Sequence, residues 1–359
     1  MASTPPDHAS SPGIGQRKAD HIQLAVSGDV GFRNKTTLLE CVRLVHDALP
    51  DIDVDAIDLS VSLLGKKLRA PIVIAAMTGG TPEAGDINRR LARIAEQRGY
   101  GIGLGSQRAM HVDLARAASY RVRDEAPTAL LLGNVGVVQA RQMATIEVAA
   151  LTAAVGADAL CVHLNPAMEV VQPGGDRDFR DGLATLARLA SELPLPVIAK
   201  ETGCGLSASV ARRLVGAGVK HVDVSGAGGT SWVAVETHRA EGSARALGQS
   251  FWDWGIPTAA SLVLVADKGL ETVIATGGVA SGLDIARALA LGAHAVGIAR
   301  PVLQALMTGG DEAAHAFLDG IESELRAAML LVGAADIAAL RRAPRLLTGE
   351  LREWASMAT

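Results

Sequence analysis

The sequence predicts an α/β protein whose core is a (β/α)8 TIM barrel, with an N-terminal extension before the barrel and helices after it. From residue 71 onward, short apolar segments rich in β-branched residues alternate with helical patterns rich in Ala, Leu and Arg. This alternation predicts parallel strands joined by right-handed crossovers. The strand segments are apolar throughout, as in sheets buried on both faces, and their number favours a closed barrel over an open doubly wound sheet.

The eight strands are expected at residues 71–77, 99–104, 128–132, 157–164, 196–200, 219–224, 271–275 and 293–298. The helices between them include 86–97, 146–155, 206–215 and 282–290. Ahead of the barrel we expect a disordered tail at 1–15 and a helix at 35–49, and the C-terminal part is expected to form helices outside the barrel. Residues 16–359 are therefore expected to form a single barrel domain.

The composition argues for a cytoplasmic protein that binds neither nucleic acid nor membrane. The formal net charge of −4 gives no global attraction to polyanions, and an aromatic content of only 3% argues against a base-stacking surface. The three cysteines, Cys41, Cys161 and Cys204, lack CxxC or zinc-ligand spacing, and Cys161 is expected to be a buried apolar residue. No apolar stretch reaches the roughly 18 residues that a membrane helix needs.

Functional groups of a barrel come from the carboxyl ends of its strands. Here every predicted strand is followed by small, polar or ionisable residues. One such end is explained by a turn or a helix cap, whereas eight together indicate a site. These ends are MTGG at 77–80, GSQ at 105–107, Asn134, HLN at 163–165, KE at 200–201, SG at 225–226, TGG at 276–278 and AR at 299–300.

The strongest local pattern is TGGVASGLD at 276–284, followed by GAHAVGIAR at 292–300. Gly277 and Gly278 allow a ligand to approach the backbone closely, and the next helix is expected to direct free N–H groups into the barrel mouth. Loops after the seventh and eighth strands are the usual phosphate site of such barrels. Together with SGAGGTSW at 225–232, they predict a phosphorylated ligand in preference to two structural turns. The long connection at 225–255, which contains three of the four tryptophans, is expected to be a lid.

A second pattern, HLNPAMEVVQPGGDRDF at 163–179, follows the fourth strand. His163 and Asn165 alternate along the strand, so both are expected to point inward. Glu169 offers a hard oxygen ligand for Mg²⁺ bound together with substrate phosphates. The alternative for His163 and Asn165 is a hydrogen-bonded core pair.

Two further segments carry cations. QRKADHI at 16–22 places Arg17, Lys18 and His21 where they suit a diphosphate, although the same residues also fit a solvated N-terminal segment. Lys200 at the end of the fifth strand is expected to contact a ligand, the alternative being a buried ion pair with Glu201.

Taken in order, these motifs resemble the type 2, flavin-dependent isopentenyl-diphosphate delta-isomerases. The resemblance runs from about residue 16 to the C-terminal helices, and so many motifs in one order make chance similarity improbable. The motifs that carry it are RKADHI, AAMTGG, GSQ, GNVG, HLNP with the following Glu and QP, KETGCG, VDVSGAGGTSW, WGIPTAASL, ATGGVASGLDIARALALGA and ARP.

The resemblance implies conversion of isopentenyl diphosphate to dimethylallyl diphosphate in isoprenoid biosynthesis, with reduced FMN as the main acid and base. It also implies Mg²⁺, NADPH or NADH as the reductant, and a homotetramer or homo-octamer. Implied FMN contacts are Met77, Thr78, Ser106, Asn134, Lys200, Ser225 and Thr230, with Gly277, Gly278, Ala299 and Arg300 at its phosphate. Implied substrate contacts are Arg17, Lys18, His21, His163, Asn165 and Trp232, with Glu169 on Mg²⁺ and with Lys200 and His163 taking part in catalysis.

The chain departs from the family pattern at two positions. Met168 stands where the family usually has Gln before the metal-binding Glu, and Gly174 stands where a further Glu is expected. A thioether replaces neither the donor nor the acceptor of an amide, so turnover is expected to depend more on the flavin or to be weaker.

Three alternatives follow. An FMN-dependent 2-hydroxy-acid oxidase needs a His–Arg pair after the sixth strand, where this chain has SGAGGTSW, and a relative of inosine-monophosphate dehydrogenase needs a nucleophilic loop cysteine, for which Cys204 is a poor candidate. A non-catalytic protein that binds FMN or an isoprenoid diphosphate has only Met168 in its favour.

Overall fold

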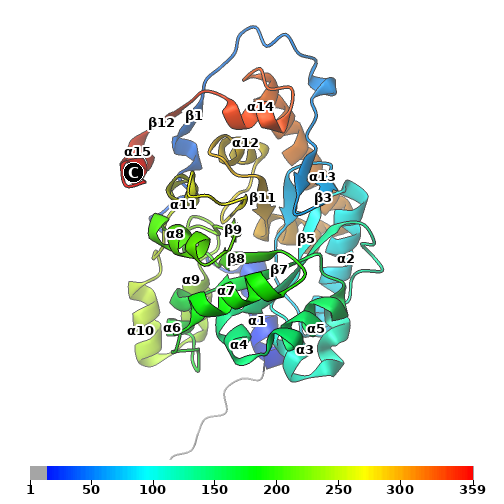
Figure 1. The fold of residues 1–359 in the computed structure, drawn as a ribbon, viewed down its shortest axis with the longest axis vertical. Helices are drawn as coiled ribbons and strands as arrows, with labels where there is room; N and C mark the ends of the chain where they lie inside the picture. The colour runs from blue at the N-terminus through cyan, green and yellow to red at the C-terminus, as the bar shows by residue number, and fades with distance from the viewer. Residues whose placement is uncertain (1–13, 359) are drawn as a thin grey trace, which may run out of the picture.

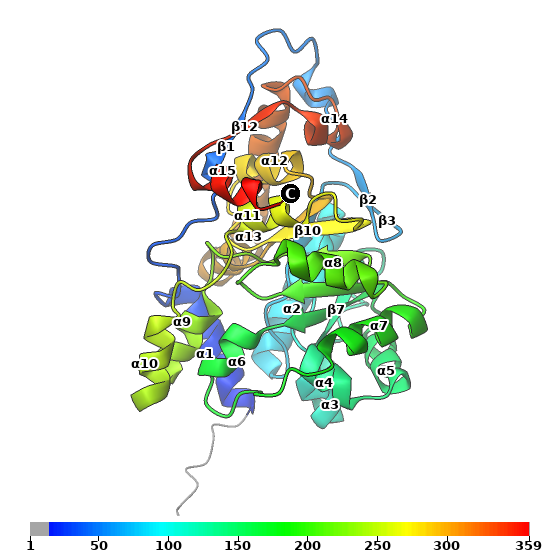
Figure 2. The same ribbon diagram turned by 60° about the vertical axis from the view of Figure 1, so that its left-hand side comes forward.

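The structure, a computed structural model, describes residues 14–358, except for the side chains of residues 14–19 and Ser27. Its centre is a closed barrel of eight parallel strands surrounded by helices (Figures 1 and 2). Consecutive strands are neighbours, and the barrel closes where β11 pairs with β4. The strands are β4 (Ile72–Ile74), β5 (Gly101–Gly103), β6 (Leu130–Gly136), β7 (Ala159–Leu164), β8 (Val197–Glu201), β9 (His221–Asp223), β10 (Thr272–Thr276) and β11 (Ala295–Ile298).

The predicted TIM barrel is confirmed, and each of its strands overlaps its predicted segment. The largest difference is at β6, which continues beyond the predicted end at residue 132 to Gly136, because Asn134, Val135 and Gly136 still pair with β7. Polar and glycine residues ended the apolar pattern there, although the backbone ladder continues through them.

Helices cover the outside of the barrel, and those predicted at 86–97, 146–155, 206–215 and 282–290 correspond to α2, α5, α8 and α12. In α2, the Thr81 hydroxyl accepts a hydrogen bond from the Ala84 N–H, and Gly99 ends the helix in the left-handed region at φ 65°. The helices are α2 (Pro82–Arg98), α4 (Val137–Gln142), α5 (Thr145–Val155), α7 (Gly182–Glu192), α8 (Ala208–Gly216), α11 (Thr258–Val265), α12 (Gly282–Ala290) and α13 (Arg300–Leu330).

A further set of short helices lies at the carboxyl end of the strands. The region 225–255 predicted as a lid forms α9 and α10, which pack against each other and against α6, with α1 beside α9 (Figures 1 and 2). These elements are α1 (Ile14–Ser27), α3 (Arg108–Val112), η3 (Leu114–Ser119), α6 (Pro166–Val171), α9 (Trp232–Arg239) and α10 (Gly242–Ser250).

The opposite end of the barrel is closed by a hairpin of two antiparallel strands, β2 (Val61–Leu63) and β3 (Lys66–Leu68). Leu63 and Leu68 are each 1% exposed and belong to the apolar cluster that fills the barrel interior. Cys161 lies in the same cluster, as predicted for a small buried residue, and burial raises the pKa of its thiol to about 12.

The helix predicted at 35–49 is wrong. The segment instead contains a single 3₁₀ turn, η1 (Leu39–Cys41), and then β1 (Val42–Leu44), which pairs antiparallel with β12 (Arg345–Leu347). The hydroxyls of Thr36 and Thr37 accept hydrogen bonds from the N–H groups of Leu38 and Leu39, which competes with helix formation. Pairing with a strand near the other end of the chain then overrides the local pattern.

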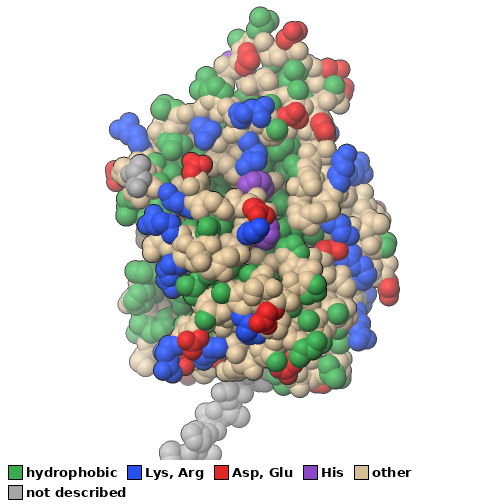
Figure 3. All heavy atoms as spheres, viewed as in Figure 1, with side chains coloured by type: hydrophobic (Ala, Val, Ile, Leu, Met, Phe, Trp, Pro, Cys, Tyr) green, Lys and Arg blue, Asp and Glu red, His purple; other side chains and the backbone are tan. Residues whose placement is uncertain are grey.

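The C-terminal region forms helices outside the barrel as predicted, with β12 as an unpredicted strand. The predicted tail at 1–15 lies outside the described residues except for its last two positions. No helix in the described part of the chain is long and apolar enough to cross a membrane. Basic and acidic side chains are interspersed on the face shown in Figure 3. The remaining elements are η2 (Val54–Ala56), α14 (Ile337–Arg342) and α15 (Gly349–Ser356).

Candidate active site

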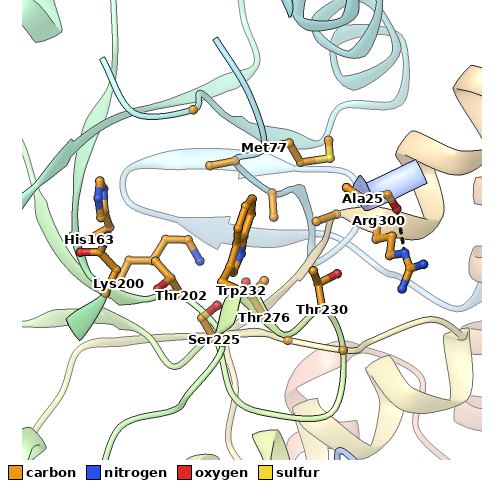
Figure 4. Close-up of a pocket in the computed structure, with 18 of the residues that line it drawn as sticks. Ala25, Met77, His163, Lys200, Thr202, Ser225, Thr230, Trp232, Thr276 and Arg300 are labelled. Carbon is orange, nitrogen blue, oxygen red and sulfur yellow. Dashed lines mark hydrogen bonds between the residues drawn. The ribbon is translucent and has the colours of Figure 1, made fainter. Parts of the chain in front are cut away.

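A cavity of about 450 Å³ opens at the carboxyl end of the strands. Residues at the ends of all eight barrel strands line it, together with residues of α1, α6 and α9. Its volume is in the range of about 300–1,000 Å³ that is typical of small-molecule sites. Figure 4 shows the arrangement: His163 and Lys200 lie on one side, Thr230 and Arg300 on the other, and the Trp232 ring stands between them.

The cavity brings together most of the residues predicted for the site. Those that line it are His21, Met77, Ser106, Asn134, His163, Asn165, Glu169, Lys200, Ser225, Thr230, Trp232, Gly277, Gly278, Ala299 and Arg300. Thr78 is buried just behind the lining, and its Oγ1 has no hydrogen-bond partner among the described residues. Arg17 and Lys18 belong to α1, but their side chains lie outside the described residues.

His163 is held by a chain of hydrogen bonds that crosses from β5 to β7. The Asn134 amide nitrogen donates to the Leu104 carbonyl at 3.0 Å, so its Oδ1 faces the His163 Nδ1 at 2.8 Å. Because that oxygen can only accept, Nδ1 must carry a proton. Protonation of Nε2 would then produce an imidazolium that donates to an anion. His163 and Asn165 are both hydrogen-bonded, the first to Asn134 and the second to Glu169.

Glu169 is the only carboxylate among the described residues that line the cavity. The Asn165 amide donates to its Oε1 at 2.8 Å, and the Asp176 backbone N–H donates to its Oε2 at 2.8 Å. The Gln172 amide adds a longer bond of 3.3 Å to the same Oε2. These donors hold a carboxyl group that is only 7% exposed in one orientation. Asn165 therefore orients Glu169 as well as lining the cavity.

Lys200 pairs with Asp223 rather than with Glu201, so the predicted alternative of a Lys200–Glu201 pair is wrong. Its Nζ donates to the Asp223 Oδ2 at 2.7 Å, and the two side chains are 8% and 7% exposed. The Glu201 carboxylate instead accepts backbone N–H groups of the loop that follows β8, including that of Gly203 at 2.7 Å. Strand alternation explains the difference, because Lys200 points into the barrel and Glu201 points out.

The glycine-rich loops after β9 and β10 lie against each other at backbone distance. A Cβ built on Gly229 would lie 2.4 Å from the backbone nitrogen of Gly278, which itself has φ +77°. No described residue accepts a hydrogen bond from the N–H of Gly229, Gly278 or Val279, and all three residues line the cavity. These loops therefore present backbone donors to a ligand, as a phosphate requires.

The expectation that α12 directs free N–H groups into the mouth is wrong. The Gly282 N–H donates to the Glu324 carboxylate at 2.7 Å, and the Asp284 N–H donates to the Ser281 hydroxyl at 3.0 Å. The helix N-terminus is thus already capped by the protein, and donors for a phosphate come from the loop that precedes the helix.

The helix α1 is fixed over the cavity from two sides. His21 and Arg239 both contact the fully buried Glu236, each at 2.7 Å. On the other side, the Arg300 guanidinium donates to the carbonyls of Ala25 at 2.8 Å and Gly28 at 2.9 Å (Figure 4). Arg300 was predicted as a phosphate contact, and in the structure its guanidinium holds the C-terminal end of α1.

Of the three tryptophans in the 225–255 connection, only Trp232 lines the cavity. Trp252 is 2% exposed and packs under α9, whereas Trp254 is 59% exposed. The lid is therefore a packed pair of helices with one aromatic side chain directed inward.

Sequence reasoning missed several polar residues at the site, among them Asp223, Arg108 and Gln139. Asp223 lies within the motif VDVSG, where alternation with the apolar Val222 and Val224 could have placed it inward. Arg108 and Gln139 line the cavity and contact Asp176, at 3.8 and 2.7 Å respectively. Both lie on helices after strand ends, where no local pattern distinguishes them from solvated residues.

Comparison with known proteins places the chain in one family. The model of the FMN-dependent dehydrogenase family matches residues 14–173 and 176–346. Isopentenyl-diphosphate delta-isomerase of Methanothermobacter thermautotrophicus is 45% identical over 95% of this chain and 95% of its own length. The enzymes of that name from Pyrococcus abyssi and Nostoc are 44% and 43% identical, over 94% and 95% of this chain and 94% and 98% of their own.

The chain belongs to the isopentenyl-diphosphate delta-isomerases of the FMN-dependent dehydrogenase family. Among solved structures, a mandelate oxidase variant with a monooxide FMN adduct superposes with a TM-score of 0.62 at 19% identity, covering 91% of this chain and 95% of that chain. A second, with a bromo-substituted ligand, gives 0.63 at 18%, covering 93% and 99%. At this identity the likeness concerns the fold alone.

The residues present fit the FMN that the family name implies. The Lys200 ammonium and the backbone donors of the glycine loops border one cavity, and the buried Thr78 hydroxyl, which has no partner among the described residues, follows the cavity residue Met77. A flat polar ring with a phosphate tail needs this combination of fixed donors along one wall and close backbone approach at one end.

The fit for Mg²⁺ is more restricted in this member of the isomerase family. Among the described residues, no group of three or more potential ligands is arranged around a metal position. Among the described residues that line the cavity, Glu169 alone offers a carboxylate, which suits Mg²⁺ only when substrate phosphates and water supply the other ligands.

Met168 lines the cavity beside these groups. Its Sδ lies 4.0 Å from the amide nitrogen of Asn165, whose shorter hydrogen bond goes to Glu169. The thioether thus adds an apolar surface where the isomerase pattern usually has an amide, and it leaves the Asn165–Glu169 pair intact.

Proposed function

We propose that the chain binds FMN in the barrel mouth and, with the flavin reduced, converts isopentenyl diphosphate to dimethylallyl diphosphate. The observation that carries this proposal is the division of one cavity into two poles. The glycine loops after β9 and β10 offer backbone donors for the phosphate of FMN, and the residues after β7 offer side chains for a diphosphate. An identity of 45% to an enzyme named isopentenyl-diphosphate delta-isomerase supports the substrate.

At the substrate pole, we assign the diphosphate to His163, Asn165 and His21, with Arg17 and Lys18 of α1 as additional cations. Because Asn134 holds the Nδ1 proton of His163, an imidazolium at this position would direct its Nε2 proton to a phosphate oxygen. Glu169 would take Mg²⁺ together with that diphosphate. Met77, Met168 and Trp232 would surround the C5 chain with apolar atoms.

At the flavin pole, we assign FMN to Met77, Thr78, Ser106, Asn134, Lys200, Ser225 and Thr230 and its phosphate to Gly277, Gly278, Ala299 and Arg300. Gly277 and Gly278 would act through their backbone groups. Both have positive φ, and neither has a side chain that would block the approach of a phosphate. Arg300 would act partly by fixing α1, since its guanidinium already donates to two α1 carbonyls.

The reaction adds a proton to C4 of isopentenyl diphosphate and removes one from C2, so the proton count is unchanged. Reduced FMN supplies an electron-rich ring and an acid–base position for this exchange. The protein orients the small C5 group through remote diphosphate contacts and excludes water with Trp232 and α1. Lys200 and His163 lie on the same side of the cavity and would direct hydrogen-bond donors toward the ligands bound there.

The finer parts of the proposal are supported by the family resemblance. NADPH, or NADH, would reduce the flavin, and the protein would work in the cytoplasm for isoprene biosynthesis as a homotetramer or homo-octamer.

The test is to reduce FMN anaerobically with the purified protein and to incubate it with Mg²⁺ and isopentenyl diphosphate in D₂O. We expect deuterated dimethylallyl diphosphate by NMR, and none when the flavin stays oxidised. A protein that binds FMN but neither isomerises the substrate nor exchanges deuterium would contradict the proposal. In that case the Met168→Gln variant distinguishes two causes. Isomerase activity that appears in the variant indicates a missing amide, and activity that stays absent indicates a different substrate.

A further inference from the structure

The feature of interest is the hydrogen-bonded network below Lys200. The Asp223 Oδ2 accepts both the Lys200 ammonium at 2.7 Å and the Thr276 hydroxyl at 3.0 Å. Its Oδ1 accepts the Ser225 backbone N–H at 3.1 Å. Three donors therefore hold this carboxylate in one orientation, in a side chain that is only 7% exposed.

Barrel register creates this network. Lys200 of β8 is the direct cross-strand partner of Asp223 of β9, and Thr276 ends the next strand, β10. All three side chains point inward, where they meet between the apolar filling of the barrel and the floor of the cavity. Lys200 and Thr276 reach the cavity, whereas Asp223 stays beneath it.

A buried ammonium without a counter-charge loses its proton readily, because burial disfavours the charged form. Asp223 opposes that loss with an opposite charge at hydrogen-bond distance. The pair is neutral as a whole, yet the ammonium is the member nearer the cavity. The network therefore presents fixed positive charge at the cavity floor.

We propose that Asp223 is a positioning residue that keeps Lys200 cationic and in place at the flavin pole, so that the protein favours the anionic, reduced form of FMN over the oxidised form. The inference rests on the proposed function for the identity of the cofactor. It concerns the redox balance of FMN, and it is independent of whether the isomerisation itself occurs.

Other titratable groups face Lys200 from the strands around it. His163 is its register partner on β7, Cys161 lies below it on the same strand, and Glu201 is its neighbour on β8. Asp223 accepts a hydrogen bond of 2.7 Å from the ammonium, so Asp223 is the group whose removal is expected to change its charge state.

The experiment compares the wild type with Asp223→Asn, which keeps the size of the side chain and removes its charge. Dissociation constants of oxidised and reduced FMN are measured between pH 6 and 9. We expect the wild type to favour reduced FMN across this range. In the variant the preference for reduced FMN should fall by about tenfold per pH unit once the unpaired lysine deprotonates.

Three further variants identify the route of the effect. Lys200→Met should lose the preference at every pH, and Lys200→Met combined with Asp223→Asn should lack the pH-dependent fall seen in Asp223→Asn, since the aspartate acts through the lysine. This double variant leaves no buried charge unpaired, so it should fold even if Asp223→Asn does not. Asp158→Asn, at an ion-paired aspartate near the opposite end of the barrel, is the matched control and should keep the wild-type pH profile.

A wild-type pH profile in Asp223→Asn, or effects of the two substitutions that simply add, would overturn the inference. If the wild type binds FMN with the expected pH behaviour but does not isomerise the diphosphate, only the proposed function fails. If the wild type binds no FMN in either redox state, both fail.

Discussion

The two ends of this barrel are built from the same strands but have different roles. At the carboxyl end, strand termini give way to glycine loops, amide side chains and cations around a cavity of about 450 Å³. At the amino end, the β2–β3 hairpin covers the strands, and Leu63 and Leu68 complete the apolar cluster that fills the barrel interior. The carboxyl end therefore holds ligands, and the amino end contributes stability.

This comparison predicts that substitutions at the two ends have different effects. A change at the hairpin should lower the free energy of unfolding and leave ligand binding unchanged. A change at the cavity should do the reverse. Each substitution tests whether stability and ligand binding are separated in this way.

Leu68→Ala should give the largest effect, a loss of about 2–5 kcal/mol in the free energy of unfolding. The Leu68 side chain is only 1% exposed, so its removal leaves a cavity in the apolar cluster. Urea denaturation measures it. FMN affinity at temperatures where the variant stays folded should equal that of the wild type. Leu49→Ala, at a side chain that is 85% exposed, is the control. A variant with intact stability and weakened FMN binding would show that the hairpin supports the cavity.

Glu169→Gln should lower kcat/KM by about 100-fold, because an amide cannot replace the carboxylate that Glu169 offers to Mg²⁺ in the cavity. The rate should also lose its dependence on Mg²⁺ concentration, and thermal unfolding should change little. Glu83→Gln on the exposed start of α2 is the matched control. Unchanged Mg²⁺ dependence would remove Glu169 from the metal site.

Gly229→Ala should weaken FMN binding by about tenfold or more, because the new Cβ would meet the backbone of Gly278, which cannot move aside cheaply. Fluorescence titration with FMN measures the change. Gly216→Ala in α8, where a Cβ meets nothing within 4 Å, is the control and should bind FMN normally. Equal binding by both variants would mean that the two glycine loops are not the phosphate pole.

The smallest effect is a pH dependence of stability at the amino end of the strands. Burial, followed by the charge of Arg341, lowers the pKa of His294 to about 4, and burial lowers that of His221. Both groups are neutral when folded, so stability is fully present above about pH 6.5 and is lost as the pH falls toward 4. We expect a loss of about 1 kcal/mol after screening at the partly exposed rings.

Denaturation curves between pH 7 and 4.5 measure this loss. His294→Gln should flatten the dependence, and His46→Gln, at an exposed ring, should not. A pH dependence that persists in His294→Gln would assign the effect to other groups.

Most of the fold could be predicted because each barrel strand is apolar on both faces and is followed by a distinct polar end. The prediction of a helix at 35–49 failed because β1 forms by pairing with β12. That strand lies roughly 300 residues away, so the sequence near β1 does not indicate the pairing. At the site, residues inside motifs such as His163, Glu169 and Lys200 could be placed in the cavity from the sequence.

Partners within the site could not be predicted in the same way. That Asp223 rather than Glu201 holds Lys200 depends on which strand face each residue occupies and on register between β8 and β9. Likewise, the capping of α12 by Glu324 depends on how α13 packs against it. Both are tertiary facts that residue patterns along one strand or helix do not contain.

Closure of the barrel by β4 and β11 also has a consequence for biosynthesis. The ribosome releases β11 roughly 220 residues after β4, which at about 5–20 residues per second is about 10–45 s of synthesis. During that interval one edge of β4 has no partner strand, and β1 waits still longer for β12. The nascent chain therefore carries open strand edges, which attract other chains, until translation is nearly complete. Slow codons placed before β11 would prolong this exposure, and chaperone dependence would rise with it.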